Sequence, residues 1–451
     1  MIADDTLLAQ FGSPLYVYDL DRVTTAAHDL LASVPEGTEV LYSLKANPHP
    51  ELVATLRAAG CGAEVSSTGE LASALAAGFA GQDLLYGGPA KTIAELRSAI
   101  TVGVHTFSVE SSVDLRRVGA VAADLGTTAR CLLRINGSAG DGGAGLRMTG
   151  AASQFGFDME TAPPDPTEFS LPGVEVTGLH FFPLTNAADE ADLAAEFASS
   201  VRTAAELADR WGLPLRMLDL GGGFACPYAV PGSRPGYPGL RDSIETALHD
   251  FLPNWRAEGT RITFESGRYL VGDSGRLLCT VMDVKKSREN RYAVLDAGVN
   301  HIGGLSGIGR LLPLAARPLS APDNPANQAG TALSLVGPLC TPADVVNRSV
   351  SLADPRPGQL LAIPNVGAYG VTASLLGFLS RPAPGEVLTS GGNVVSVSRL
   401  ELTRTPFGQE HIVGTESAAV EPLPDQGRNG RDDRELGRTL RAAPDWRVTQ
   451  T

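Results

Sequence analysis

The 451-residue sequence predicts an α/β fold, in which a (β/α)8 barrel is followed by a mainly antiparallel β-domain. From about Glu39 to Gly272, short apolar segments alternate with stretches rich in alanine, leucine and arginine. Regular alternation of strand and helix indicates a parallel sheet, and eight such units indicate a closed barrel. After Gly275, β-rich segments and turns replace the helical stretches. The chain is also too long for one ordinary core, so two domains are expected.

The expected barrel strands are short apolar runs, most of which precede a helical stretch. They are Val40–Leu44, Ala63–Ser66, Leu84–Tyr86, Thr106–Val109, Cys131–Ile135, Gly178–Phe182, Met217–Leu220 and Ile262–Glu265. The clearest helical stretches are Pro50–Ala59, Gly69–Ala77, Ile93–Ile100, Val113–Leu125 and Ala188–Trp211. The chemistry of such barrels gathers where the strands end. Lys45, His180, the glycines 221–223 and Glu265 all lie at these positions.

The second domain is expected to contain five recognisable strands. They are Leu277–Lys285, Arg291–Leu295, Ala332–Val336, Gln359–Ile363 and Asn393–Thr403. The strand-like opening segment at residues 15–18 is predicted to join this sheet. The expected domain limits are therefore 1–25 for the N-terminal segment, 26–275 for the barrel and 276–416 for the β-domain. Residues 417–451 are polar and rich in arginine, aspartate, glycine and proline, which predicts a disordered tail.

Composition narrows the class of partner. The net charge of −14 argues against nucleic acid and anionic membranes. No basic leader and no long apolar stretch opens the chain, so neither secretion nor membrane insertion is expected. The five cysteines are widely spaced and form no CxxC pair, which argues against a disulfide framework and a common metal site. This cysteine usage is typical of the reducing cytoplasm.

Lys45 is the most informative residue of the chain. It lies in residues 42–47 (YSLKAN), where apolar and polar residues alternate as in a strand. Prolines 48 and 50 then end the strand. A lysine at the end of a buried strand carries a large desolvation penalty. It either extends its amine to solvent, or it forms a Schiff base with a cofactor aldehyde.

Other residue types along the chain also have two interpretations. Three consecutive glycines, Gly221, Gly222 and Gly223, would let backbone N–H groups approach a phosphate, although such a turn alone is usually an ordinary loop. Glu265 is a cofactor ligand or a surface carboxylate. Cys340 is a reactive thiol or an inert small residue, and Tyr369 is a phosphate ligand or a packed ring.

Taken together, these motifs resemble the pyridoxal-phosphate-dependent decarboxylases of fold type III, which have the alanine racemase-like fold. This family includes diaminopimelate and ornithine decarboxylases. The resemblance is carried by residues 42–47 (YSLKAN), 64–71 (EVSSTGEL), 218–224 (LDLGGGF), 265–270 (ESGRYL), 337–344 (GPLCTPAD) and 365–370 (NVGAYG). The motifs extend over most of the chain, and their order and spacing make the resemblance specific.

The resemblance implies a role for each motif. Lys45 would hold pyridoxal phosphate as a Schiff base, and the glycines 221–223 would bind its phosphate with Gly267, Arg268 and Tyr369. Glu265 would pair with the pyridine nitrogen and keep it protonated. His180 and Thr185 belong to the stretch that contacts the cofactor. Burial and the cofactor are expected to lower the pKa of Lys45.

The segment around Cys340 is implied to act across a homodimer interface. In the family this segment enters the partner subunit's active site, where the cysteine donates a proton to Cα after CO2 is lost. Thr341 follows the cysteine. In diaminopimelate and ornithine decarboxylases the residue at this position is acidic and binds the substrate's distal ammonium. A neutral hydroxyl cannot supply that charge pair. Asp344 is a second candidate for substrate binding.

Two further departures bear on chemistry and substrate. Phe182 stands where the family has a histidine that stacks on the cofactor ring. A phenyl ring can stack but cannot hydrogen-bond or change charge. The arginine-containing element that grips a distal carboxylate in diaminopimelate decarboxylases is missing after residue 301. These departures resemble a secondary-metabolism subgroup, which includes the glutamyl-acyl-carrier-protein decarboxylase of butirosin biosynthesis. A carrier-linked or conjugated amino acid is therefore an expected substrate.

The resulting prediction is a pyridoxal-phosphate-dependent amino-acid α-decarboxylase that acts as a homodimer on a free or conjugated amino acid. Three alternatives stay open. An amino-acid racemase on the same fold would lack the Cys340 segment. A non-catalytic homologue that regulates a decarboxylase would generally lose cofactor residues, whereas Lys45, Glu265, Cys340 and Tyr369 are all present. A pyridoxal-phosphate carrier protein would lack the β-rich half.

Overall fold

The computed structural model describes residues 2–136, 146–147, 153–161, 163–182, 184–303, 314–320, 332–352 and 354–404. The expected disordered tail at 417–451 lies outside these ranges. No helix within them combines the length and apolar character needed to cross a bilayer.

Eight parallel strands close into a barrel, which confirms the predicted fold class. In spatial order they are β2 (Glu39–Ser43), β3 (Gly62–Val65), β4 (Leu84–Tyr86), β5 (Thr106–Val109), β6 (Ala129–Asn136), β9 (Val174–His180), β11 (Met217–Asp219) and β12 (Arg261–Ser266). The ring closes because β12 pairs in parallel with β2. These strands are buried along nearly their whole length, as expected when helices cover a sheet.

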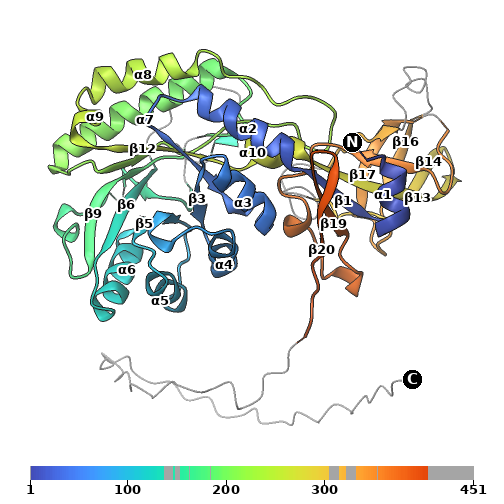
Figure 1. The fold of residues 1–451 in the computed structure, drawn as a ribbon, viewed down its shortest axis with the longest axis horizontal. Coiled ribbons are helices and arrows are strands. Elements are labelled where there is room, and N and C mark those ends of the chain that lie inside the picture. Colours follow the sequence, from blue (N-terminus) through green and yellow to red (C-terminus); the bar gives the residue numbers. More distant parts are fainter. Residues whose placement is uncertain are drawn as a thin grey trace, which may run out of the picture. The chain divides into compact units, whose positions relative to one another are not determined.

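Helices surround the barrel strands (Figure 1). They are α2 (Leu20–Ser33), α3 (Pro50–Ala58), α4 (Thr68–Ala76), α5 (Ile93–Thr101), α6 (Ser112–Asp124), α7 (Glu190–Trp211), α8 (Leu240–Phe251), α9 (Trp255–Glu258) and α10 (Arg268–Val271). Local chemistry sets their ends. Thr92 and Glu95 form a reciprocal capping box at the start of α5. Gly212 ends α7 in the left-handed conformation, with φ of 59°.

Nine further strands form a mixed, mainly antiparallel sheet, which confirms the second part of the predicted fold. Its strands are β1 (Leu15–Asp19), β13 (Gly275–Ser287), β14 (Asn290–Leu295), β15 (Leu319–Ser320), β16 (Ala332–Val336), β17 (Val345–Ser351), β18 (Leu360–Ile363), β19 (Gly385–Ser390) and β20 (Asn393–Arg399). The opening strand β1 lies between β13, to which it is antiparallel, and β19, to which it is parallel. The helix α1 (Asp4–Phe11) precedes it.

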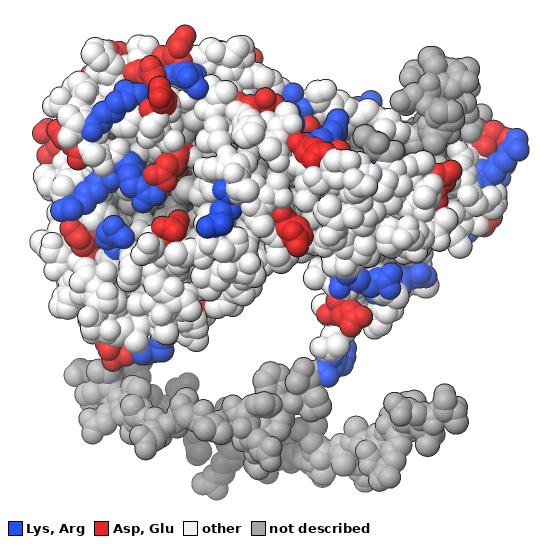
Figure 2. Space-filling view, viewed as in Figure 1, with Lys and Arg blue, Asp and Glu red and all other residues white. Residues whose placement is uncertain are grey.

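Two short pairings extend the scaffold beside the barrel. Strand β8 (Phe157–Asp158) pairs with the end of β6, and β10 (Leu184–Thr185) pairs with β7 (Leu146–Arg147). Short 3₁₀ turns are η1 (Leu44–Ala46), η2 (Gly81–Asp83), η3 (Pro166–Glu168), η4 (Gly272–Ser274), η6 (Val371–Ala373) and η7 (Phe378–Ser380). On the face shown in Figure 2, basic and acidic side chains lie in mixed groups.

Candidate active site

Lys45 lies directly after β2 rather than within it. The expected strand Val40–Leu44 ends at Ser43, and Leu44–Ala46 form the 3₁₀ turn η1. The turn is held by Tyr42, whose hydroxyl donates to the Asn47 carbonyl at 2.7 Å. The Lys45 side chain is 43% exposed, whereas Leu44 and Ala46 are buried. The lysine therefore projects from a rigid turn, and its amine stays accessible to a small molecule.

The Lys45 amine faces a carboxylate and an aromatic ring. Its Nζ lies 3.7 Å from Glu64 Oε2 and 5.3 Å from the centroid of the Phe182 ring. Burial lowers the pKa of Lys45, but the Glu64 and Glu265 carboxylates outweigh it and hold that pKa above its ordinary value. The expectation of a lowered pKa is therefore wrong for the free amine, because the neighbouring negative charge had not been counted.

Three buried carboxylates converge at the ends of neighbouring strands. Glu64 on β3, Asp219 on β11 and Glu265 on β12 are at most 3% exposed. Burial raises the pKa of Asp219 to about 7, and it raises the pKa of Glu265 well above the ordinary range. Glu64 raises both pKa values further because its carboxylate is close to both groups. Glu265 Oε1 and Asp219 Oδ2 have no hydrogen-bond partner among the described residues.

His180 ends β9 and lies between these groups. Its Nε2 is 3.5 Å from Glu265 Oε1, and its Nδ1 is 2.7 Å from the Ser108 hydroxyl. Burial lowers the pKa of His180 well below its ordinary value, and Arg134 and Lys45 act in the same direction. The imidazole is therefore neutral. Donor atoms of His180, Asp219 and Glu265 lie within 4.8 Å of one another, a spacing that a metal ion could also bridge.

The glycines 221–223 form a turn that leaves no room for side chains. A Cβ on Gly221 would lie 2.1 Å from the Phe181 carbonyl oxygen, and one on Gly222 would lie 2.4 Å from the Glu265 carbonyl oxygen. Gly221 and Gly223 also have φ of 69° and 124°, values that residues with a side chain rarely adopt. The Gly221 N–H donates to Asp219 Oδ1 at 2.8 Å. The turn thus brings bare backbone next to the carboxylate cluster.

An aromatic cluster packs around Phe224, the residue directly after the glycine turn. Phe224, directly after the turn, lies 5.8 Å from Phe197 and 5.7 Å from Tyr237 between ring centroids. Phe197 in turn packs edge-on against Phe264 of β12 at 5.2 Å. Each such contact contributes about 0.5–1.5 kcal/mol beyond area burial. Packing of this kind fixes the turn relative to the strands that carry Asp219 and Glu265.

The η1 turn has three neighbours that were predicted to bind the cofactor phosphate: Gly267, Arg268 and Tyr369. A Cβ on Gly267 would lie 2.8 Å from Ala46 Cβ, so the two segments touch. Tyr369 comes from the loop after β18, and its N–H donates to the Ala46 carbonyl at 2.7 Å. The Arg268 guanidinium lies 4.8 Å from the Tyr369 ring centroid. A residue from the β-domain half of the chain is thereby fixed beside the Lys45 turn.

Phe182 and Thr185 follow the end of β9. Phe182 lies beyond the strand, which ends at His180 instead of continuing to Phe182 as expected. Its ring faces both Lys45 and, at 5.9 Å, the Arg134 guanidinium. Thr185 is half-buried in β10. Just beyond it, the Ala187 N–H donates to the Gly223 carbonyl at 2.7 Å, which places this segment against the glycine turn.

The Cys340 segment is separate from this cluster within the described chain. Cys340 is exposed in the loop between β16 and β17, and Thr341 beside it is half-buried. No contact between these residues and Lys45 occurs among the described residues of one chain. Asp344 is buried, and its carboxylate accepts the N–H groups of Val299 at 2.8 Å and Leu339 at 2.7 Å. It therefore holds the loop in shape, and its role toward a substrate stays a prediction.

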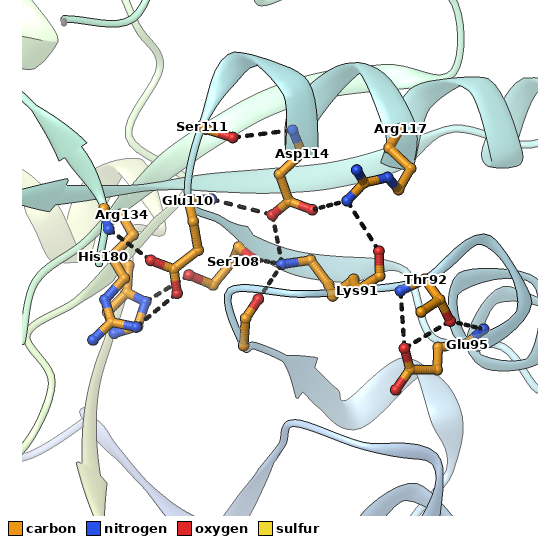
Figure 3. A network of polar contacts seen from close by, with 12 residues as sticks. Lys91, Thr92, Glu95, Ser108, Glu110, Ser111, Asp114, Arg117, Arg134 and His180 are labelled. Atoms are coloured by element: carbon orange, nitrogen blue, oxygen red, sulfur yellow. Dashed lines mark hydrogen bonds and ion pairs between the residues drawn. The ribbon is translucent and has the colours of Figure 1, made fainter. Parts of the chain in front are cut away.

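Sequence reasoning missed several residues that the structure brings to the cluster. Glu64 and Asp219 stood inside motifs but received no role, and Ser108 and Arg134 were not considered. Arg134 lies on β6 and donates to Glu110 Oε1 at 2.7 Å (Figure 3). Its guanidinium also faces the Phe182 ring. Each is a polar residue within an otherwise apolar strand, and that interruption was the available signal.

The comparisons agree with this geometry. Residues 20–272 match the family described as "Pyridoxal-dependent decarboxylase, pyridoxal binding domain". The chain belongs to the pyridoxal-dependent decarboxylase family. This membership confirms the resemblance inferred from the motifs. It also identifies pyridoxal phosphate as the cofactor.

Named relatives of this pyridoxal-dependent decarboxylase act on several substrates. The present chain is 28% identical to an L-glutamyl-acyl-carrier-protein decarboxylase of Niallia circulans, over 91% of this chain and 95% of the relative. It is 30% identical to a 2-((L-alanin-3-ylcarbamoyl)methyl)-2-hydroxybutanedioate decarboxylase of Staphylococcus aureus over 82% and 92%. The diaminopimelate decarboxylase of Helicobacter pylori, solved with L-lysine, has the same fold, with a TM-score of 0.73, 24% identity and coverage of 88% and 95%.

The residues of this decarboxylase fit pyridoxal phosphate. An accessible lysine amine suits the aldehyde, and a turn of bare backbone beside it suits the phosphate. Glu265 Oε1, buried and without a partner among the described residues, suits the ring nitrogen.

Proposed function

We propose that this protein removes the α-carboxylate of an amino acid as CO2, with Lys45 as the residue that binds the cofactor. The observation that carries this proposal is the position of the Lys45 amine. It lies 3.7 Å from Glu64, within reach of the Glu265 charge and over the Phe182 ring, which in turn contacts the glycine turn. A lysine, a phosphate cradle and a carboxylate for the ring nitrogen are the three protein groups that this cofactor needs.

Each group has a distinct task in this proposal. Lys45 Nζ would hold the cofactor through its aldehyde. Glu265 would accept the ring N–H and keep that nitrogen protonated, and Phe182 would pack on the ring. When bound, pyridoxal phosphate takes up the electron pair that CO2 leaves behind.

Several groups would hold the cofactor phosphate. Gly222 and Gly223 of the glycine turn offer backbone N–H groups, whereas the Gly221 N–H already donates to Asp219. Gly267 lets the chain approach closely, and Arg268 supplies positive charge. The Tyr369 hydroxyl adds a neutral donor. We assign His180, Asp219 and Glu265 to the cofactor rather than to a metal ion, because the Lys45 amine and the Phe182 ring lie beside this group.

The active site is completed in this proposal by a second subunit. Cys340 of the partner subunit would donate a proton from Sγ to Cα of the product, and Thr341 would lie beside the substrate tail. Exposed apolar side chains support a homodimer, since Val395 and Val397 on one face of β20 are 53% and 52% exposed and Leu402 is 68% exposed. The exposed Cys340 is consistent with a residue that reaches another chain.

The substrate is proposed to be an amino acid linked to a carrier protein or another conjugate, in a secondary-metabolite pathway. Thr341 offers no negative charge to a distal ammonium. Two of the three relatives named above, those of Niallia circulans and Staphylococcus aureus, act on amino-acid units joined to a larger group. A cytoplasmic location is proposed from the cysteine usage alone. The alternatives are not favoured, because the relatives are named as decarboxylases.

Release of CO2 tests this proposal. Protein loaded with pyridoxal phosphate would be incubated with free ornithine, lysine, arginine, glutamate, aspartate and diaminopimelate, and with glutamate linked to a pantetheine arm or a carrier protein. Lys45→Ala is the blank. We expect CO2 from a linked amino acid and none from the free ones. Turnover of a free amino acid would overturn the substrate proposal, and no CO2 from any of them would contradict the proposed activity on these classes.

A further inference from the structure

Ser108, His180 and Glu265 form a line of polar groups across the barrel end. Ser108 on β5 is 1% exposed, and its Oγ lies 2.7 Å from His180 Nδ1. The other imidazole nitrogen, Nε2, faces Glu265 Oε1 at 3.5 Å, and neither of these two buried atoms has another hydrogen-bond partner among the described residues. Figure 3 shows Ser108 and His180 in the same network as Lys91 and Arg134. The line connects a strand on one side of the barrel with the carboxylate assigned to the cofactor ring.

The Ser108 strand is held by a buried ion pair. Lys91 Nζ donates to the Ser108 carbonyl at 2.8 Å and to the Gly88 carbonyl at 2.7 Å, and it lies 2.6 Å from Asp114 Oδ2. Both charged side chains of this pair are at most 3% exposed. Lys91 therefore uses its donors on backbone and on Asp114, and none of these contacts involves the Ser108 hydroxyl.

A neutral imidazole carries its single proton on only one of its two nitrogens. His180 is neutral because it is buried among Arg134, Lys45 and Lys91. If Nδ1 carried the proton, the Nε2 lone pair would face the lone pairs of a Glu265 carboxylate. If Ser108 donates to Nδ1, the proton lies on Nε2 and points at Glu265. Among the described residues, His180 Nδ1 is the one hydrogen-bond partner found for the Ser108 hydroxyl.

We propose that Ser108 is a positioning residue, whose hydroxyl holds His180 with its proton on Nε2 so that the imidazole donates to Glu265. This inference rests on the proposed pairing of Glu265 with the cofactor ring nitrogen. Burial and the nearby Glu64 and Asp219 favour the protonated form of Glu265. A hydrogen bond from His180 Nε2 to Glu265 Oε1 would oppose these effects, because a hydrogen bond to a carboxylate stabilises its charged form. Only the ionised carboxylate can accept the ring N–H and keep the ring an electron sink.

The first test needs no cofactor. Protein labelled with ¹⁵N-histidine would be studied by long-range ¹⁵N–¹H NMR, with the His180 signals assigned from His180→Gln. We expect the proton on Nε2 in wild type and in Ser108→Thr, and a shift toward Nδ1 in Ser108→Ala. Thr106→Val, which removes a hydroxyl from the same strand, should match wild type. A proton on Nδ1 in wild type, or the same shift in both hydroxyl-deletion variants, would overturn the proposal.

The second test follows the ring nitrogen of bound cofactor. With ¹⁵N-labelled pyridoxal phosphate, the nitrogen should be protonated in wild type and in Ser108→Thr, and less protonated in Ser108→Ala. With a turned-over substrate, Ser108→Ala should lose about tenfold in kcat, as expected for one hydrogen bond to a charged group, with KM within about twofold. An unchanged nitrogen in Ser108→Ala contradicts the inference. An unchanged nitrogen in Glu265→Gln instead contradicts the pairing on which it rests, so the two failures are distinguishable.

Discussion

At the scale of single residues, charge around Lys45 decides how the site accepts its cofactor. The Glu64 and Glu265 carboxylates favour the charged form of the Lys45 amine. Arg134, which is paired with Glu110, acts in the opposite direction. This excess of carboxylates keeps the free lysine protonated. A protonated lysine cannot attack an aldehyde, so capture of pyridoxal phosphate should depend on pH through the Lys45 pKa.

Removing the charge of Glu64 should ease this capture. A raised Lys45 pKa means that the neutral amine becomes more abundant as pH rises, so the capture rate should increase with pH. Glu64→Gln should move this pH profile about one unit lower, and the rate at neutral pH should rise about tenfold. Stopped-flow absorbance measures the rate. Glu39→Gln, at the opposite end of β2, is the control, and an identical profile for Glu64→Gln and wild type would contradict the account.

Some of these residues could be recognised from sequence, and the reason is chemical. Lys45 and Glu265 stand at strand ends next to turn residues, where a charged residue that follows an apolar run predicts a functional site. Glu64 and Arg134 lie inside strands, and their roles depend on which strands become neighbours when the barrel closes. Ser108 and His180 are 72 residues apart in the chain and touch only because β5 and β9 both flank β6. No local pattern contains that information.

At the scale of elements, the glycine turn and the η1 turn both follow barrel strands, and Phe182 contacts both the glycine turn and the Lys45 amine. Strand and helix periodicity predicted the eight barrel strands and five of the surrounding helices to within a few residues, since parallel strands are continuous apolar runs. It did not predict the helices α2 and α8. Strand β19 was not predicted, because it contains a buried polar residue, Glu386, and follows a proline-rich stretch. The ends of β2 and β9 were placed too late, because backbone bonding in η1 and the loop after His180 was not visible in the side-chain pattern.

A methyl group on the glycine turn should weaken cofactor binding. In Gly222→Ala the new Cβ would lie 2.4 Å from the Glu265 carbonyl, a backbone atom that cannot move away easily. Overpacking of this kind costs about 1–3 kcal/mol, so cofactor affinity should fall about 10- to 100-fold. Absorbance titration with pyridoxal phosphate measures it. In the control Gly236→Ala a Cβ meets nothing within 4 Å, so this variant should bind pyridoxal phosphate with wild-type affinity. Equal affinity of both variants would show that the glycine turn does not bind the phosphate.

The β1–β19 pair should make stability depend on pH. Burial raises the pKa of Glu386 to about 7, and Tyr18 donates to its Oε1 at 3.2 Å. The folded state therefore binds this proton more tightly than the unfolded state does. Its contribution to stability is complete below pH 4.5 and is lost as pH rises through about 7, a loss of about 3 kcal/mol.

Thermal unfolding between pH 5 and pH 8 checks this sign. Glu386→Gln cannot ionise, so the Tm of the wild type should fall relative to that of Glu386→Gln as the pH rises. Glu289→Gln removes a 96% exposed carboxylate and should follow the wild type. A constant difference between wild type and Glu386→Gln across this pH range would show that Glu386 does not titrate in the folded protein.

At the scale of the whole molecule, the described chain holds only part of the proposed machinery. Lys45, Glu265 and Tyr369 come together, whereas the Cys340 loop contacts none of them among the described residues. The family resemblance, not any residue pattern, supplied the idea that this loop acts on another subunit. The exposed face of β20 is the structural support for such a partner.

Mixed dimers test this arrangement. Lys45→Ala and Cys340→Ala should each be inactive toward the substrate, but a mixture of the two should regain about a quarter of wild-type activity. Random exchange puts half of the subunits into mixed dimers that each have one intact site. Activity and subunit exchange would be measured together. Exchange without recovery would show that Lys45 and Cys340 serve the same site within one chain.

The most direct test of the central claim is to find where the cofactor attaches. Protein loaded with pyridoxal phosphate would be reduced with borohydride, digested and analysed by mass spectrometry. The chain has only four lysines, Lys45, Lys91, Lys285 and Lys286, so the assignment is unambiguous. We predict one phosphopyridoxyl group, on Lys45, and none in Lys45→Ala. A label on Lys91, or no label on wild type, would contradict the account.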